Sequence, residues 1–242
     1  MLEGLYSAAA GMEAQQLQLD AVSNDLANLS TDGYQAERVA FGDLLYNRVE
    51  IAGTETGAGA GAEAQIIGRD ESEGALKQTG DPLDLAVEGQ GYFQVTRADG
   101  SLALTRDGEF GVDASGEIVD TQGNRLHPPI TLPKGTSASD LRVAEDGTVT
   151  AGGKRLGRIE LVTVPAPGRL TPEGGGLLVP GSASGAPQTA SGRIQQGALE
   201  DSNVDIGRDM TTMVGAERAF QMQSTAIQNE SQMMSIANQL KT

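Results

Sequence analysis

The C-terminal stretch NVDIGRDMTTMVGAERAFQMQSTAIQNESQMMSIANQLKT, residues 203–242, organises the rest of the chain. Its large apolar residues recur every seven positions, at Ile206, Met213, Phe220, Ile227 and Met234. A second apolar column lies beside the first and ends at Leu240. A seven-residue repeat keeps such side chains on one slowly twisting face of a helix. The stretch therefore predicts a long helix that packs along this face, either as an ordinary amphipathic core helix or against a partner helix.

The start of this helix is indicated by two polar residues. Ser202 and Asp205 have the three-residue spacing of a capping box, in which side chains bind the free backbone N–H groups of the first turn. The sequence therefore predicts that the helix begins at Ser202 or just after it.

A matching repeat lies at the other end of the chain. Residues of the first helical segment also recur every seven positions, at Leu5, Met12, Leu19 and Leu26. Two such seams favour a helical pair formed by the two termini, with the remaining chain inserted between them. Such a pair would leave the extra apolar column of the C-terminal helix exposed in a monomer, which indicates assembly with other subunits.

Composition excludes several classes of protein. The chain has 242 residues, 33 of them Gly, with 3% aromatic residues and no Trp, which favours a small or elongated core with many turns. It has no cysteine, so disulfides and thiolate metal sites are excluded. Its net charge of −16 argues against nucleic acid or an anionic membrane as partner.

Charge also bears on how the chain begins. Residues 1–32 contain no Lys or Arg, whereas a cleaved signal peptide starts with a basic region. No stretch reaches the 18 or so apolar residues of a membrane span. We therefore expect no membrane insertion and, for any export, no cleaved leader.

The segments next to the helices carry turn signals. The first helix is expected to end near Leu29, with Gly33 in a left-handed conformation shortly after it. From Ile51 to about Glu73 the sequence is rich in Gly, Ala and Glu, which predicts an irregular and mobile segment.

The middle of the chain changes to a period of two. Leu83, Leu85 and Val87 alternate with Asp84, Ala86 and Glu88, and turn signals such as Asp99-Gly100 follow about every ten residues. The predicted fold class is α+β, in which the terminal helices pair as a coiled-coil-like stem around an inserted, mainly antiparallel all-β domain. The expected domains are a stem (1–32 with 203–242), a partly flexible connecting region (33–74 with 190–202) and the β domain (75–189). The low-complexity run 181–192 is interpreted as a loop.

No pattern in the chain predicts catalysis, a cofactor or a metal. The single histidine, His127, has no Cys or second His beside it, and acidic neighbours such as Asp81 and Asp84 are expected by chance among 33 carboxylates. The GxG at Gly89 precedes a strand and not a helix, which fails the dinucleotide-binding context. An enzyme is therefore the least favoured function, behind a subunit of an assembly and a binding module that does not polymerise.

Three motifs resemble the flagellar rod and hook protein family. The N-terminal run NDLANLSTDGY (24–34) is similar to the family's N-terminal signature, with the matching residues Asn24, Asn28, Thr31, Gly33 and Tyr34. The runs from Gly80 to Val95 and from Thr105 to Phe110 resemble the middle domain of its longer members. The C-terminal signature is matched by Ser202, Asn203, Asp205 and Arg218. Asp25 and Gln35 depart from the family pattern, and we expect Gln35 to remove a charge from an inter-subunit contact.

The resemblance implies a structural axial subunit of the flagellar basal body, of the intermediate length typical of the proximal and distal rod proteins, with the distal type favoured. It implies a subunit that polymerises helically with itself, and we expect the contacts between copies at Leu5, Met12, Leu19, Leu26, Ile206, Met213, Phe220, Ile227, Met234 and Leu240. It also implies adjacent rod and hook proteins, the flagellar export apparatus and the surrounding rings as partners. The alternative from another class is a binding module that does not polymerise, with a helical stem and a ligand-binding β domain.

Overall fold

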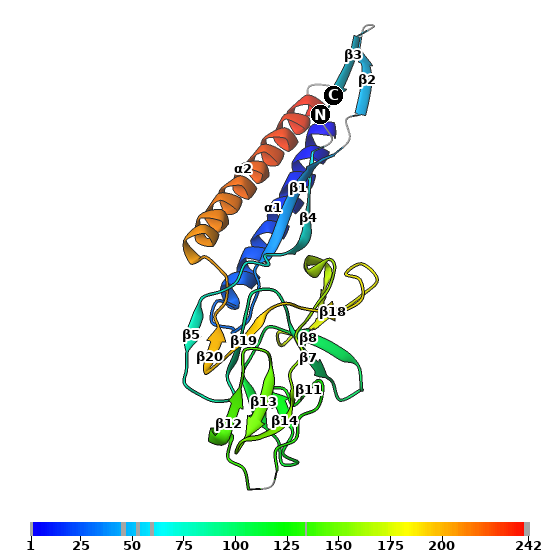
Figure 1. Cartoon of the computed structure of the whole chain (residues 1–242). Coiled ribbons are helices and arrows are strands. Elements are labelled where there is room, and N and C mark those ends of the chain that lie inside the picture. The colour runs from blue at the N-terminus through cyan, green and yellow to red at the C-terminus, as the bar shows by residue number, and fades with distance from the viewer. Residues whose placement is uncertain (1, 45–46, 52–53, 59–60, 134, 240–242) are drawn as a thin grey trace. The chain divides into compact units, whose positions relative to one another are not determined.

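In the computed structural model the chain divides into two compact units (Figure 1). The structure describes residues 2–44, 47–51, 54–58, 61–133 and 135–239. The helical unit consists of residues 1–27, 37–67 and 205–242, and the β unit consists of residues 28–36 and 68–204. Two terminal helices and a mainly antiparallel β region confirm the predicted α+β class.

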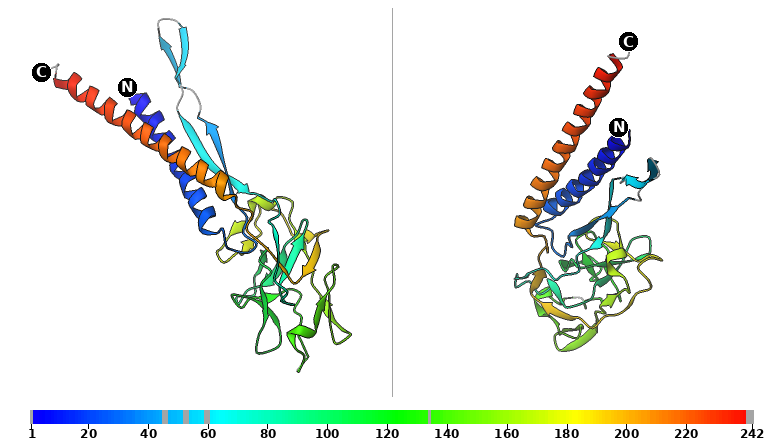
Figure 2. Two further views of the ribbon diagram at one scale, coloured as in Figure 1. Left: turned by 90° about the vertical axis from the view of Figure 1, so that its left-hand side faces the viewer. Right: turned by 90° about the horizontal axis from the view of Figure 1, so that it is seen from above.

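The two long helices of the helical unit are α1 (Leu2–Ala27) and α2 (Ile206–Gln239). They lie side by side in Figure 1 and in both views of Figure 2. A Cβ added to Gly4 would lie 3.2 Å from a carboxylate oxygen of Glu230, and one added to Gly11 would lie 2.6 Å from the amide nitrogen of Gln223. The helices are therefore antiparallel, because the position along α2 falls by seven as the position along α1 rises by seven.

Helix α2 begins later than the sequence predicted. The side chain of Asp205 accepts hydrogen bonds from the backbone N–H groups of Gly207 (2.9 Å) and Arg208 (3.1 Å), so Asp205 caps the helix. Ser202 is not the cap, because its hydroxyl accepts only a long hydrogen bond from Val204, at 3.4 Å, outside the helix. The predicted capping box is therefore wrong, because Asp205, which it placed in the first turn of the helix, is itself the cap.

The helical unit also contains two strand pairs. Strand β1 (Glu37–Asp43) pairs with β4 (Ala62–Arg69), and β2 (Asn47–Ile51) forms an antiparallel hairpin with β3 (Thr54–Ala58). Strands β3 and β4 lie in the segment after Ile51, which the Gly-rich sequence predicted to be irregular. Backbone pairing stabilises them despite the small side chains, as where Leu44 N–H donates to Gly61.

The β unit is built on a seven-stranded antiparallel sheet in the order β16-β17-β8-β7-β11-β10-β9. Its strands are β16 (Thr171–Pro172), β17 (Leu178–Val179), β8 (Leu102–Thr105), β7 (Phe93–Thr96), β11 (Arg125–Leu126), β10 (Ile118–Asp120) and β9 (Phe110–Val112). The predicted hairpin at Asp99-Gly100 joins β7 to β8, and Gly100 has the expected positive φ of 83°.

Smaller antiparallel sheets complete the β unit. They comprise β12 (Leu141–Val143), β13 (Thr148–Ala151) and β14 (Lys154–Arg158), then β15 (Val162–Thr163) with β18 (Gln188–Thr189), β6 (Leu85–Glu88) with β19 (Arg193–Gln196), and β5 (Leu76–Gln78) with β20 (Ala198–Glu200). Two short 3-10 helices cover Ala138–Asp140 and Pro167–Arg169. Strand β18 lies within the run 181–192, which is therefore not wholly a loop.

The core of the β unit is closed. Phe93, Val95 and Leu126 are completely buried, and the rings of Phe93 and Phe110 meet edge to face with centroids 5.2 Å apart. The alternation predicted around Leu85 is wrong, because Asp84 and Ala86 are buried as well. That strand lies inside the unit, where both of its faces meet other residues.

Candidate assembly interface

The predicted seam residues are only partly buried. This holds on α1 for Leu5, Met12, Leu19 and Leu26 and on α2 for Met213, Phe220, Ile227 and Met234. Ile206, which was assigned to the same seam, keeps 45% of its surface exposed. Leu240 lies outside the described residues. The structure places the two helices against each other, but the role of these side chains in assembly stays a prediction.

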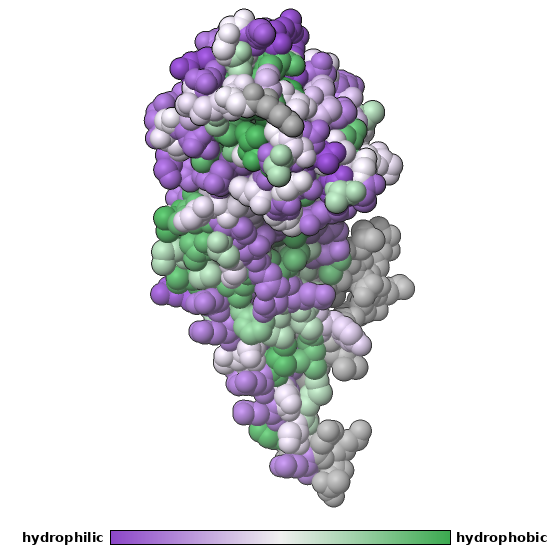
Figure 3. All heavy atoms as spheres, turned by 90° about the horizontal axis from the view of Figure 1, so that it is seen from below, coloured by the Kyte–Doolittle hydropathy of each residue, from purple (hydrophilic) through white to green (hydrophobic). Residues whose placement is uncertain are grey.

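Further apolar residues of α2 are open to solvent. Met210, Met222 and Met233 are 53%, 68% and 57% exposed. Figure 3 shows apolar side chains at the surface among hydrophilic ones on the face that it draws. Because large exposed apolar surfaces usually mark interaction sites, the helical unit offers area for a partner.

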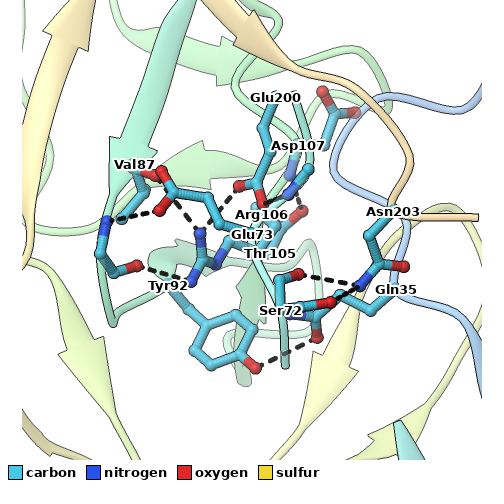
Figure 4. Close-up of polar contacts among 12 residues, drawn as sticks. Gln35, Ser72, Glu73, Val87, Tyr92, Thr105, Arg106, Asp107, Glu200 and Asn203 are labelled. Atoms are coloured by element: carbon cyan, nitrogen blue, oxygen red, sulfur yellow. Dashed lines mark hydrogen bonds and ion pairs between the residues drawn. The ribbon is translucent and has the colours of Figure 1, made fainter. Parts of the chain in front are cut away.

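Asn203 links three segments of the β unit. Its side-chain oxygen accepts a hydrogen bond from Ala36 N–H at 2.8 Å, and its amide group donates to the carbonyl oxygens of Asp70 (2.9 Å) and Ser72 (2.8 Å). Figure 4 shows the amide directed at Ser72. This residue of the C-terminal motif therefore holds the chain on either side of the β1–β4 ribbon.

The N-terminal motif forms a turn that meets the C-terminal motif. Asn28 accepts a hydrogen bond from the hydroxyl of Thr31 at 3.2 Å, and Tyr34 accepts one through its carbonyl oxygen from Asn203 N–H. Gly33 has the predicted positive φ, 68°, and donates to the carbonyl oxygen of Glu200 at 2.7 Å. A Cβ at Gly33 would collide with the backbone of Arg106. Glycine is therefore required here both for its positive φ and because a side chain would not fit.

A buried ion pair lies next to this junction. Arg106 donates to a carboxylate oxygen of Glu200 at 2.8 Å, and the two side chains are 5% and 3% exposed. Arg106 also donates to the carbonyl oxygens of Val87 and Gly89, and its guanidinium lies 5.4 Å from the ring centre of Tyr92 (Figure 4). The other carboxylate oxygen of Glu200 accepts from Gly74 N–H. The pair therefore joins strands from distant parts of the chain.

Gln35 belongs to the same cluster. It is 3% exposed and accepts a hydrogen bond from the Tyr92 hydroxyl at 3.2 Å. The expectation that this position concerns an inter-subunit contact is therefore wrong, since the side chain is enclosed in the β unit. Burial raises the pKa of the Tyr92 hydroxyl, and the nearby Arg106 opposes that shift.

Two carboxyl groups nearby have raised pKa values. Burial raises the pKa of Asp107 to about 6, against a hydrogen bond from Glu109 N–H that lowers it. Burial likewise raises the pKa of Asp32, and the charge of Lys77 opposes this. A raised pKa alone does not make a catalytic site, because structural networks perturb pKa values as well.

The arrangement holds distant segments of the β unit together. Among the described residues, no group of three or more acidic, His or Cys side chains is placed to bind a metal ion. In the same part of the chain no helix has the length and apolar character to cross a membrane. Sequence reasoning missed the Arg106–Glu200 pair; the one available signal was an arginine directly after the apolar strand LALT (102–105).

Three family descriptions match the chain. The flagellar hook protein FlgE/F/G D1 domain matches residues 86–151, the flagellar basal body rod FlgEFG protein C-terminal region matches 195–240, and the flagella basal body rod protein family matches 5–35. The matches at both ends cover the two helices and the motif junction.

Full-length relatives decide the family. The chain is 34% identical to the flagellar basal-body rod protein FlgG of Borreliella burgdorferi, over 100% of this chain and 99% of the relative. It is 35% identical to FlgG of Agrobacterium fabrum, over 98% of each chain, and 35% identical to FlgG of Bacillus subtilis, over 94% of each. The chain belongs to the flagellar basal-body rod protein family.

This rod protein is of the FlgG type, which confirms the distal-rod alternative among the family's intermediate-length members. It is a structural subunit of the rod, located in the flagellar basal body. Members of this family assemble with other rod and hook proteins. The family is known for structural roles and not for enzymatic ones.

Proposed function

We propose that this rod protein polymerises helically through its terminal helices and so forms a shaft that transmits torque to the hook. In this proposal α1 and α2 form a coiled-coil-like stem, and a connecting region joins the stem to an inserted β domain. The stem covers residues 1–32 and 203–242, the connecting region 33–74 and 190–202, and the β domain 75–189. A contact between copies that does not close on itself generates a filament, which is the geometry that a shaft requires.

The observation that carries the proposal is the incomplete burial of the helical unit. Phe220 and Met213 remain partly exposed, although a fully buried large apolar side chain contributes about 1.5–3 kcal/mol. A helical pair that leaves this free energy unused gains it when neighbouring copies cover the same side chains. Assembly therefore completes the core that one copy lacks.

The proposal extends to further partners. Adjacent rod and hook proteins would meet the two ends of the polymer, the export apparatus would deliver the chain, and ring proteins would surround it. The net charge of −16 supports partners other than nucleic acid.

Hydrogen–deuterium exchange on the purified chain, before and after polymerisation, tests the proposal. Peptides from residues 2–27 and 206–239 should exchange fast in the monomer and become protected in the polymer, because packing between copies stabilises the helices. Peptides from β7 and β8 serve as the internal control and should be protected in both states.

The opposite pattern would favour the binding module considered above. In that case both terminal helices would be strongly protected in a monomer that never polymerises, and the stem would be complete in a single copy.

A further inference from the structure

Helix α2 carries an exposed row of residues that winds slowly around it, because each step of four residues turns the row by about 40°. Its members follow one another at every fourth position and are all exposed: Ile206, Met210, Val214, Arg218, Met222 and Ala226. Side chains four apart form the ridge that packs between the ridges of a neighbouring helix or sheet. This ridge, which we call the 206–226 ridge, is apolar except for Arg218.

The central part of this ridge, at Val214, Arg218 and Met222, points away from the contact between the helices, because these residues lie roughly 80–180° around α2 from the residues that face α1. Gln223 and Glu230 are the α2 residues that lie over Gly11 and Gly4 of α1, and neither belongs to the ridge. Met222 is 68% exposed and Val214 is 45% exposed. The helical unit therefore uses one side of α2 internally and leaves this other side open.

Arg218, at the centre of the ridge, has no acidic partner among the described residues. An arginine in the middle of an apolar row favours a site that combines apolar contact with a carboxylate, because a desolvated guanidinium needs a charged acceptor.

A groove that combines apolar residues with carboxylates lies elsewhere in the helical unit. It has a volume of about 420 Å³ between α1 and the β1–β4 ribbon. Its apolar lining includes Ala10, Ala14 and Leu17 of α1 and Leu44 after β1, and its carboxylates are Glu13 and Glu63. Both glutamates are exposed. Ala10, Ala14 and Leu17 have the spacing of one helical face, which differs from the face marked by Gly4 and Gly11.

We propose that the central part of the 206–226 ridge of one copy docks into this groove of a second copy. Arg218 then lies between the carboxylates of Glu13 and Glu63, while Val214 and Met222 contact the apolar lining. This inference rests on the proposed function, since it names the contact through which copies assemble.

The lengths of the two surfaces agree. Ala10 to Leu17 covers about 10 Å of α1, and Val214 to Met222 covers about 12 Å of α2, at 1.5 Å per residue. The charges agree as well, because the groove supplies two carboxylates where the ridge supplies one cation. A second copy is the occupant because this exposed ridge and this groove belong to the same chain.

Charge exchange tests the contact. Arg218→Glu should raise the protein concentration needed for polymerisation by about tenfold, equivalent to about 1.4 kcal/mol. Adding Glu13→Arg and Glu63→Arg to that variant should restore most of the loss, because the pair is re-formed with opposite signs. Glu217→Arg, a charge reversal beside the ridge, is the matched control and should polymerise like the wild type. Sedimentation of the polymer measures each value, and circular dichroism checks that each variant is folded.

Cross-linking tests proximity directly, since the chain has no cysteine. A tagged Met222→Cys protein mixed with an untagged Ala64→Cys protein should form a mixed disulfide under mild oxidation. Ser231→Cys, exposed on α2 outside the ridge, should form far less with Ala64→Cys.

The outcomes distinguish a failure of the ridge contact from a failure of the proposed function. A wild-type chain that never polymerises would overturn the proposed function and the ridge contact together. A polymer that tolerates Arg218→Glu, or that cross-links equally through Ser231→Cys, would overturn the ridge contact alone. In that case the ridge binds another rod or hook protein, or none.

Discussion

The two units of the molecule bury their apolar residues to very different extents. In the β unit Phe93, Leu104 and Leu126 are completely buried, and in the helical unit Met12, Phe220 and Met234 remain partly exposed. The β unit satisfies its own hydrophobic surface within one copy. The difference indicates that one unit folds by itself, while the other depends on what covers it.

Among the variants that test this difference between the two units, Phe220→Asp is expected to have the largest effect. A carboxylate in an interface that excludes water should abolish polymerisation, because both the apolar contact and the solvation of the charge are lost. The unfolding midpoint of the β unit should stay unchanged. Light scattering measures the first quantity and near-ultraviolet circular dichroism the second.

The control for this variant is Gln221→Asp, one residue further along and exposed in the monomer. It should reduce polymerisation far less than Phe220→Asp. Equal polymerisation of Phe220→Asp and the wild type would show that the seam does not face a partner.

Glu200→Ala should destabilise the β unit by about 3–5 kcal/mol, because it leaves Arg106 buried without its carboxylate. Gly74 N–H loses its acceptor in the same variant. Urea unfolding followed in the β unit measures the loss. The exposed Glu88→Ala is the control and should change stability by less than about 0.5 kcal/mol. An equally small change in Glu200→Ala would mean that the Arg106–Glu200 pair makes no net contribution to the stability of the β unit.

Asp107→Asn tests electrostatics within the closed unit. Because burial raises the folded-state pKa of Asp107 from 3.8 to about 6, the fold loses stability as the pH rises from about 4 to about 6 and the carboxyl ionises. Removing the charge should therefore stabilise the β unit by on the order of 2 kcal/mol at pH 7, and the gain should disappear as the pH falls to about 4. Asn retains an oxygen for the N–H of Glu109. Thermal unfolding at several pH values checks this, and a gain independent of pH would contradict it.

Asp205→Ala has the smallest expected effect. Loss of the N-cap should make helix formation less favourable by about 1 kcal/mol and fray the start of α2. Exchange rates of the amides of residues 207–210 report this fraying directly. Ser202→Ala is the matched control and should leave these rates unchanged. A larger effect of Ser202→Ala would restore the capping box predicted from the sequence.

The sequence predicted the elements that depend on local patterns. The long helices follow from the seven-residue repeats, and the conformation of Gly33 follows from its place after a helix end. The hairpin at Asp99-Gly100 likewise depends on neighbouring residues. Such signals lie within a few positions of one another, so one stretch is enough to identify them.

The sequence did not predict the features that depend on distant partners. Arg106 and Glu200 are 94 positions apart, and neither residue carries a local sign of the other. Strand β4 exists because it pairs with β1, so its weak composition misled a prediction based on composition alone. The buried Asp84 shows the same limit, since alternation says nothing of a second covering layer.

The antiparallel contact of α1 with α2 has a consequence for the order of folding. Gly4 faces Glu230, so the two chain segments that form this contact are separated by nearly the whole sequence. The hairpins of the β unit close over a few residues, and their loop-closure entropy is correspondingly small. During folding the strands should therefore pair early, and the two helices should dock last, once the final residues of the chain are free to reach the first.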